Sequence, residues 1–125
     1  MITAGCQPTA SSQSTDTPAA QATAQGAPFA NLDVAGFRAK MNDNNVVILD
    51  VRTPQETAQG MIEGAIEINV TAPDFAQRVA ELDKDKTYLV YCRSGRRSVT
   101  ACNIMAEQGF SDLYNLLGGY LAWSR

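Results

Sequence analysis

Residues 87–109 read TYLVYCRSGRRSVTACNIMAEQG and contain the pattern that decides the fold. The apolar run 88–91 predicts a buried strand, and residues 98–109 predict a helix. Cys92 follows the strand directly and opens a loop that contains Gly95. Backbone amides of such a loop, together with the N-terminus of the following helix, attract an anion and lower the pKa of a thiol. Cys92 is therefore the candidate nucleophile.

Composition limits the chemistry that this loop can perform. The formal net charge of −3 argues against nucleic-acid binding, so the local cluster of Arg93, Arg96 and Arg97 points to a small anionic substrate. The sequence has no histidine, which excludes Cys–His proteases, His-based zinc sites and a His general base. Its three cysteines are too scattered for a disulfide framework or a metal site. We expect no metal and no cofactor.

Strand and helix patterns alternate on both sides of the Cys92 stretch. Strands are expected at 46–49, 65–68 and 113–116, and helices at 34–41 after Asp33, at Thr53-Pro54, at 71–82 and around 120–123. Gly109 is suited to end the central helix in a left-handed conformation. This order predicts an α/β domain over residues 28–125, with a parallel sheet of about five short strands and helices on both faces. We expect it to be a monomer.

The carboxyl ends of the strands should form the site. Ligands of open parallel sheets bind beyond these ends. The corner Asp50-Val51-Arg52 leaves one strand there, and the Cys92 loop leaves another. We expect the two to be neighbours in space.

Residues 1–27 differ from the rest of the chain. They are rich in Ala, Ser, Thr, Gln and Pro and contain one charged residue, Asp16, which predicts a disordered tail. Thr3-Ala4-Gly5-Cys6 resembles the end of a bacterial lipoprotein signal, and on this interpretation Cys6 carries a lipid that tethers the domain to the cell envelope, facing the periplasm. The alternatives are a free cysteine in a polar tail and a cytoplasmic protein.

The chain from 29 to 123 resembles the rhodanese (sulfurtransferase) family in four pieces that occur in the family's order. They are Asp50-Val51-Arg52 with Glu56, the segment GMIEGA at 60–65, the loop CRSGRRS at 92–98, and LGGY at 117–120 with Trp123. Met61 departs from the histidine that is usual in the family. The resemblance implies that Cys92 takes sulfane sulfur from thiosulfate, forms a persulfide, and passes the sulfur to cyanide or a thiol.

Roles for the neighbouring residues follow partly from the same resemblance and partly from their positions in the sequence. Cys92 and Arg97 are the expected catalytic pair, with Arg97 closing the cradle around the sulfur. Arg52 either faces the substrate or pairs with Glu56 four residues on, and we favour the pairing. Cys102 and Asp50 are expected to be structural, and the Gly118-Gly119 turn to be packing. The remaining candidates for substrate binding are Arg93, Ser94, Gly95, Arg96 and Ser98.

Two other functions fit parts of the pattern. A Cys-dependent phosphatase or arsenate reductase uses a related loop, but its arginine usually stands six positions after the cysteine, whereas Arg97 stands five after Cys92. A shorter loop makes a smaller ring of amides, which suits a sulfur atom better than a tetrahedral phosphate. The second alternative is a non-catalytic sulfur-carrier or binding domain, which turnover would distinguish from an enzyme.

Overall fold

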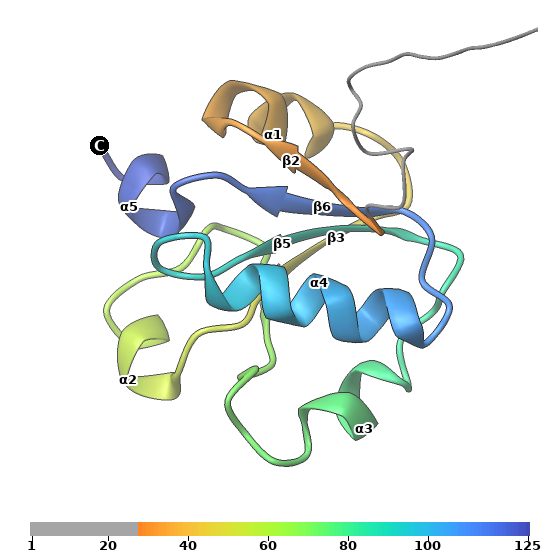
Figure 1. Cartoon of the computed structure of the whole chain (residues 1–125). Helices are drawn as coiled ribbons and strands as arrows, with labels where there is room; N and C mark the ends of the chain where they lie inside the picture. The colour runs from red at the N-terminus through yellow and green to blue at the C-terminus, as the bar shows by residue number, and fades with distance from the viewer. Residues whose placement is uncertain (1–27) are drawn as a thin grey trace, which may run out of the picture.

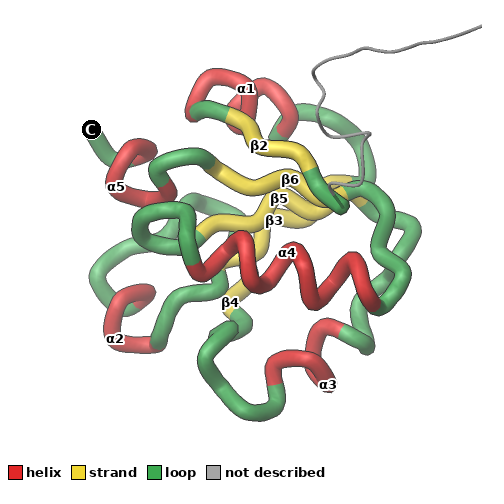
Figure 2. The backbone as a smooth tube through the Cα atoms, in the orientation of Figure 1, coloured by secondary structure: helices red, strands yellow, loops and turns green. Residues whose placement is uncertain are grey.

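The computed structural model describes residues 28–125, so the expectations for the tail, including lipid on Cys6, lie outside the described residues. Within the described part, five parallel strands form one sheet in the order β2-β6-β5-β3-β4 (Figure 1, with β4 labelled in Figure 2). The predicted parallel α/β architecture is confirmed. The strands are β2 (Ala30–Leu32), β3 (Val46–Asp50), β4 (Ile66–Glu67), β5 (Thr87–Tyr91) and β6 (Leu113–Leu116).

Strand β2 is the one that the sequence did not indicate. It has only three residues, and Leu32 is the only large apolar one among them. Its pairing with β6 sets Asn31 opposite Asn115. Such a short edge strand is stabilised by its pairing with β6, so its own sequence does little to predict a strand.

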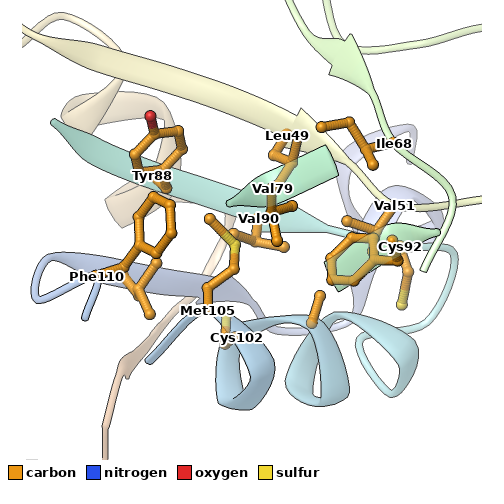
Figure 3. Packing of buried hydrophobic residues seen from close by; sticks show 13 residues of the cluster. Leu49, Val51, Ile68, Val79, Tyr88, Val90, Cys92, Cys102, Met105 and Phe110 are labelled. Carbon is orange, nitrogen blue, oxygen red and sulfur yellow. The ribbon is translucent and has the colours of Figure 1, made fainter. Parts of the chain in front are cut away.

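Helices cover both faces of the sheet, as predicted (Figure 2). On one face α3 (Phe75–Val79) and α4 (Arg97–Glu107) pack on the sheet, and on the other lie α1 (Val34–Lys40) and α5 (Gly119–Trp123). Figure 3 shows Val79, Cys102 and Met105 meeting Leu49 and Val90 of the strands. All five side chains are fully buried, and each large one contributes about 1.5–3 kcal/mol of hydrophobic stabilisation. No helix of the described residues is long and apolar enough to cross a membrane.

The helix boundaries follow local chemistry. Asp33 accepts a hydrogen bond from the Gly36 amide (2.8 Å) and caps α1, while Thr53 forms a capping box with Glu56 at the start of α2 (Pro54–Thr57). Gly109 has φ +103° and lies two residues beyond the end of α4, as its predicted role requires. These capping predictions are confirmed.

The helix predicted over 71–82 is wrong in length, because α3 begins only at Phe75 and ends at Val79. The side chain of Asn69 accepts hydrogen bonds from the amide and hydroxyl of Thr71, which holds a turn there. Pro73 further disfavours helical geometry at the residue before it. Because of this turn and the proline, the helix begins at Phe75 and not at Thr71.

Candidate active site

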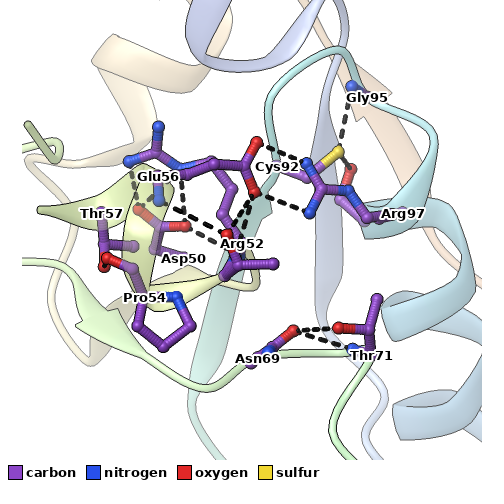
Figure 4. A network of polar contacts seen from close by, with 12 residues as sticks. Asp50, Arg52, Pro54, Glu56, Thr57, Asn69, Thr71, Cys92, Gly95 and Arg97 are labelled. Atoms are coloured by element: carbon purple, nitrogen blue, oxygen red, sulfur yellow. Dashed lines mark hydrogen bonds and ion pairs between the residues drawn. The ribbon is translucent and has the colours of Figure 1, made fainter. Parts of the chain in front are cut away.

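Cys92 lies at the carboxyl end of β5, the central strand of the sheet. Residues 88–92 are all buried, so the strand holds the thiol in a fixed place beneath the loop that follows. The loop residues Arg93, Ser94 and Arg96 are exposed, and α4 starts at Arg97. The buried sulfur therefore lies beneath an exposed loop (Figure 4).

Hydrogen-bond donors converge on the Cys92 sulfur. The Gly95 amide donates to Sγ at 3.1 Å, and Ser98 Oγ lies 3.4 Å from it. Burial raises the pKa of the Cys92 thiol, but the hydrogen bond with the Ser98 hydroxyl, which can donate to an ionised sulfur, and those from the amides of Ser98, Gly95 and Ser94 outweigh it, so the pKa is lowered overall. Gly95 has φ +99°, a conformation that other residues rarely adopt, and this lets its amide turn toward the sulfur.

The Gly118-Gly119 turn supports this loop from behind. Tyr120 donates its amide to the Cys92 carbonyl (2.8 Å), and Leu121 donates to the Arg93 carbonyl (3.0 Å). A Cβ on Gly119 would lie 2.5 Å from the Arg93 oxygen, so only glycine permits this approach. The turn thus positions the Cys92 loop, a role beyond the packing expected from the sequence. The sequence feature that indicates this role is the pair of glycines before Tyr120, because glycine allows two backbone segments to approach closely.

Arg97 points to a carboxylate on another element. Its two terminal nitrogens donate to the two oxygens of Glu56, each at 2.8 Å, and so join α4 to α2. The hydrogen bonds from Arg97 are the main cause that lowers the pKa of Glu56 to about 2. Glu56 is thus a site residue whose partner the sequence did not reveal, because the two residues are 41 positions apart.

Arg52 does not pair with Glu56, so that expectation is wrong. Its Nε and one terminal nitrogen donate to the buried Asp50 carboxylate at 2.7–3.1 Å. The same terminal nitrogen also donates to the Gly60 carbonyl at 2.6 Å. The Tyr91 hydroxyl also donates to Asp50, at 2.6 Å. The fully buried Asp50 requires a counterion, and Arg52, two residues on, lies on the same side of the chain. Arg52 therefore has a structural pairing, with a different partner from the expected one.

The geometry of the strand, loop and helix agrees with a family match. The model of the family described as Rhodanese-like domain matches residues 33–125. The chain belongs to the rhodanese-like family.

Individual members of the family match over most of the described domain. A protein named sulfurtransferase from Allochromatium vinosum is 42% identical over 81 residues, which are 65% of this chain and 74% of that protein. Thiosulfate sulfurtransferase GlpE of Pseudomonas aeruginosa is 36% identical over 85 residues, or 67% of this chain and 74% of that one. The crystal structure of a rhodanese-like domain protein from Staphylococcus aureus, 29% identical, superposes with a TM-score of 0.66 over 74% of this chain and 89% of its own.

A cleft of about 320 Å³ opens beside the loop of this rhodanese-like domain. It brings Arg52 and Glu56 together with the exposed Arg93 and with Tyr120 of α5. The Arg52 guanidinium carbon lies 4.4 Å from the centre of the Tyr120 ring. The structure thus places Arg52, Glu56 and Arg93 around one opening, while the candidates Ser94 and Arg96 lie on the exposed part of the loop.

The second described thiol, Cys102, lies in the core. Its side chain is fully buried on α4, and burial, with a smaller contribution from the nearby Cys92, raises the pKa of the Cys102 thiol to about 12. It is thus poorly suited to nucleophilic attack, as expected. Among residues 28–125, no three His, Cys, Asp or Glu side chains gather as metal ligands would.

Proposed function

We propose that this chain is a sulfurtransferase that takes sulfane sulfur from thiosulfate, or from another sulfane donor, and transfers it through a persulfide on Cys92. The Cys92 thiolate attacks the outer sulfur of thiosulfate, the S–S bond of the donor breaks, and sulfite leaves with the bonding electron pair. The persulfide anion then gives its outer sulfur to cyanide, forming thiocyanate, or to a thiol acceptor. Both steps exchange anions, so neither needs a proton shuttle, which suits a site without histidine.

The polar groups that contact the Cys92 sulfur, the Gly95 amide at 3.1 Å and Ser98 Oγ at 3.4 Å, are the observation that supports this proposal most strongly, because they lower the pKa of the thiol. The attacking species must be a thiolate, and a free cysteine with a pKa of about 8.5 is mostly protonated at neutral pH. The donors on Sγ that lower the pKa would also surround the outer sulfur of a persulfide. Because Cys92 is buried, the donor must reach it through the exposed loop, where Arg93 and Arg96 would attract a dianion.

The position of Arg97 favours sulfur transfer over phosphate chemistry. A phosphatase would need the planar fork of this arginine to hold phosphate oxygens. Here both terminal nitrogens already donate to Glu56. The low pKa of Glu56 keeps this partner ionised at neutral pH.

Steady-state turnover separates an enzyme from a sulfur carrier. With thiosulfate and cyanide in excess, we expect thiocyanate to form in many equivalents per protein chain. A reaction that stops after one equivalent would instead identify a carrier domain. Cys102→Ala should retain most of the turnover, because that thiol is fully buried and burial raises its pKa to about 12, which keeps it protonated.

We further propose that Cys6 carries lipid and tethers the domain to the cell envelope, facing the periplasm. The likeness of residues 3–6 to the end of a lipoprotein signal supports this proposal. Two or more acyl chains on one cysteine give stable anchoring. Labelling with palmitate in a bacterial host, followed by fractionation, should place the label in the membrane, and a Cys6→Ser variant should lose it. An unlabelled protein in the soluble fraction would contradict the proposal.

A further inference from the structure

A chain of polar side chains runs from the Cys92 sulfur to the edge strand of the sheet. Ser98 Oγ lies 3.4 Å from Sγ and donates its proton to Asn115 Oδ1. The amide nitrogen of Asn115 in turn donates to Asn31 Oδ1 at 3.0 Å. Ser98 and Asn115 are buried, with 0% and 1% of their surface exposed, whereas Asn31 is exposed on β2.

This arrangement suits a protonated thiol. A hydroxyl has a single proton, and Ser98 gives its proton to Asn115. Toward Cys92 it can then only accept, which requires that Cys92 be S–H. A thiolate is an acceptor only, so it would face the lone pairs of Ser98 rather than a proton.

Asn115 can resolve this conflict because the two ends of its amide have nearly the same shape. If the Ser98 proton turns to the sulfur, the buried Asn115 Oδ1 loses its donor, an arrangement that proteins avoid. Rotation of the amide by half a turn puts the Asn115 nitrogen next to Ser98 Oγ, to which it can donate. Its oxygen then faces Asn31, whose exposed side chain is free to present its own nitrogen.

We propose that Asn115 is a positioning residue that sets the direction of the Ser98 hydroxyl, and that its amide rotates when Cys92 becomes a thiolate. The thiol proton leaves to water or a buffer base, and no proton passes through the amide. The proposal rests on the proposed role of Cys92 as an attacking thiolate. It adds Asn115 of β6 to the site: its amide oxygen accepts from Ser98 when Cys92 is a thiol, and its amide nitrogen donates to Ser98 when Cys92 is a thiolate.

Other charged and titratable groups around Cys92 define the conditions of the test. The pKa of Glu56 is about 2 and that of Cys102 is about 12, so neither titrates over about pH 5 to 10, a range that brackets the usual thiol value. The hydrogen bonds to Glu56 raise the pKa of Arg97, which therefore stays charged. Arg97 and Cys102 of α4 interact electrostatically with the thiol. Glu56 of α2 binds Arg97, and Asp50 at the end of β3 binds Arg52. Arg93 and Arg96 lie in the loop itself.

Nuclear magnetic resonance of the unaltered protein tests the rotation directly. Below the pKa of Cys92, the side-chain amide protons of Asn115 should show nuclear Overhauser contacts to Asn31. Above it, they should show contacts to the Ser98 β protons, with a midpoint equal to that of Cys92. The change should be absent in Cys92→Ser. Amide protons that keep their contacts with Asn31 through the whole titration of Cys92 would overturn the proposal.

Asn115→Asp tests the same idea through reactivity. An ionised carboxylate can only accept, so it would hold the Ser98 proton away from the sulfur. We expect the pKa of Cys92 to rise by about one unit, so that alkylation by iodoacetamide, measured at a pH at least one unit below the pKa of Cys92 in the wild-type protein, slows about tenfold. Peptide mass analysis separates the reaction of Cys92 from that of Cys6 and Cys102. A pKa that does not rise would contradict the proposal.

Ser98→Ala provides the matched background, because it has no hydroxyl to turn. In this background Asn115→Asp should produce less than half of the pKa shift that it produces beside Ser98. A shift of half or more would mean that the new charge acts on Cys92 directly, which would overturn the positioning role. Both readouts follow the thiol and not sulfur transfer. A protein that shows them but makes no thiocyanate would refute the proposed function and leave this inference standing.

Discussion

Glu56 holds Arg97 through two hydrogen bonds of 2.8 Å, one to each carboxylate oxygen. The pair joins the first turn of α4, directly after the Cys92 loop, to α2 on the neighbouring corner of the sheet. Its two side chains are 31% and 26% exposed, so the solvent reduces the strength of the ion pair. Its main effect is therefore to orient Arg97.

The first prediction concerns the pH dependence of stability. Glu56 has a pKa lowered from 4.5 to about 2 in the fold, so the unfolded chain binds its proton first. The stabilisation from this carboxylate is complete above about pH 4.5 and is lost as the pH falls toward 2. Denaturant unfolding at a series of pH values gives the acid slope, which is the change of the free energy of unfolding with pH between about 4.5 and 2. Glu56→Gln should remove the part of this slope that comes from Glu56.

The exposed Glu63 offers a matched control. At neutral pH, Glu63→Gln should keep the free energy of unfolding within about 0.5 kcal/mol of the wild-type value, as surface substitutions usually do. At neutral pH, Glu56→Gln should lower the free energy of unfolding by about 1 kcal/mol, since an ion pair at a partly exposed site and part of a helix cap are lost. Equal acid slopes for the wild-type protein and Glu56→Gln would contradict the assignment.

The second prediction tests the contribution of Arg97 to the transfer. Arg97→Ala should slow the reaction of Cys92 with thiosulfate more than tenfold, which requires only about 1.4 kcal/mol of transition-state stabilisation. Arg78→Ala, at an exposed position on α3, serves as the control for removal of a surface charge. Single-turnover kinetics with saturating thiosulfate measure the step. A rate for Arg97→Ala within twofold of wild type would show that the arginine is only structural.

The third prediction concerns the exposed arginines of the loop. Arg93→Ala and Arg96→Ala should raise the KM for thiosulfate several-fold with little change in kcat, because these charges attract a dianion without touching the sulfur. Added salt should have the same effect on the wild-type protein, since exposed charges are screened over about 10 Å at 0.1 M. A KM that is independent of ionic strength would exclude electrostatic attraction.

The fourth prediction concerns the turn behind the loop. Gly119→Ala would place a methyl group 2.5 Å from the Arg93 oxygen, whereas Gly64→Ala meets nothing within 4 Å. Both glycines have positive φ, so Gly64→Ala measures the backbone strain alone. We expect Gly119→Ala to lose at least tenfold in thiocyanate formation and Gly64→Ala to retain most of it. Similar activities for the two variants would show that the turn does not position the loop.

The sequence predicted what is encoded locally. The apolar run before Cys92 indicated the central strand, and Asp33 and Thr53 marked helix starts through their own capping bonds. Strand β2 escaped detection because it is stabilised by its pairing with β6.

The contacts of the site were predicted less well, because they depend on residues far apart in the chain. Local spacing suggested that Glu56 pairs with Arg52, but in the fold Arg97 from another element reaches it and Asp50 takes Arg52. The interaction of Asn115 with Ser98 is equally non-local, since it spans 17 positions. No periodicity or motif indicates such a pair.

The most direct measurement is the mass of the Cys92 peptide after the protein has been treated with thiosulfate. A persulfide mechanism predicts a gain of one sulfur atom on this peptide, and its loss with formation of thiocyanate when cyanide is added. Cys102→Ala should gain the sulfur as the unaltered protein does, and Cys92→Ser should gain none while remaining folded. An unmodified Cys92 peptide, or sulfur found on another cysteine instead, would contradict the account.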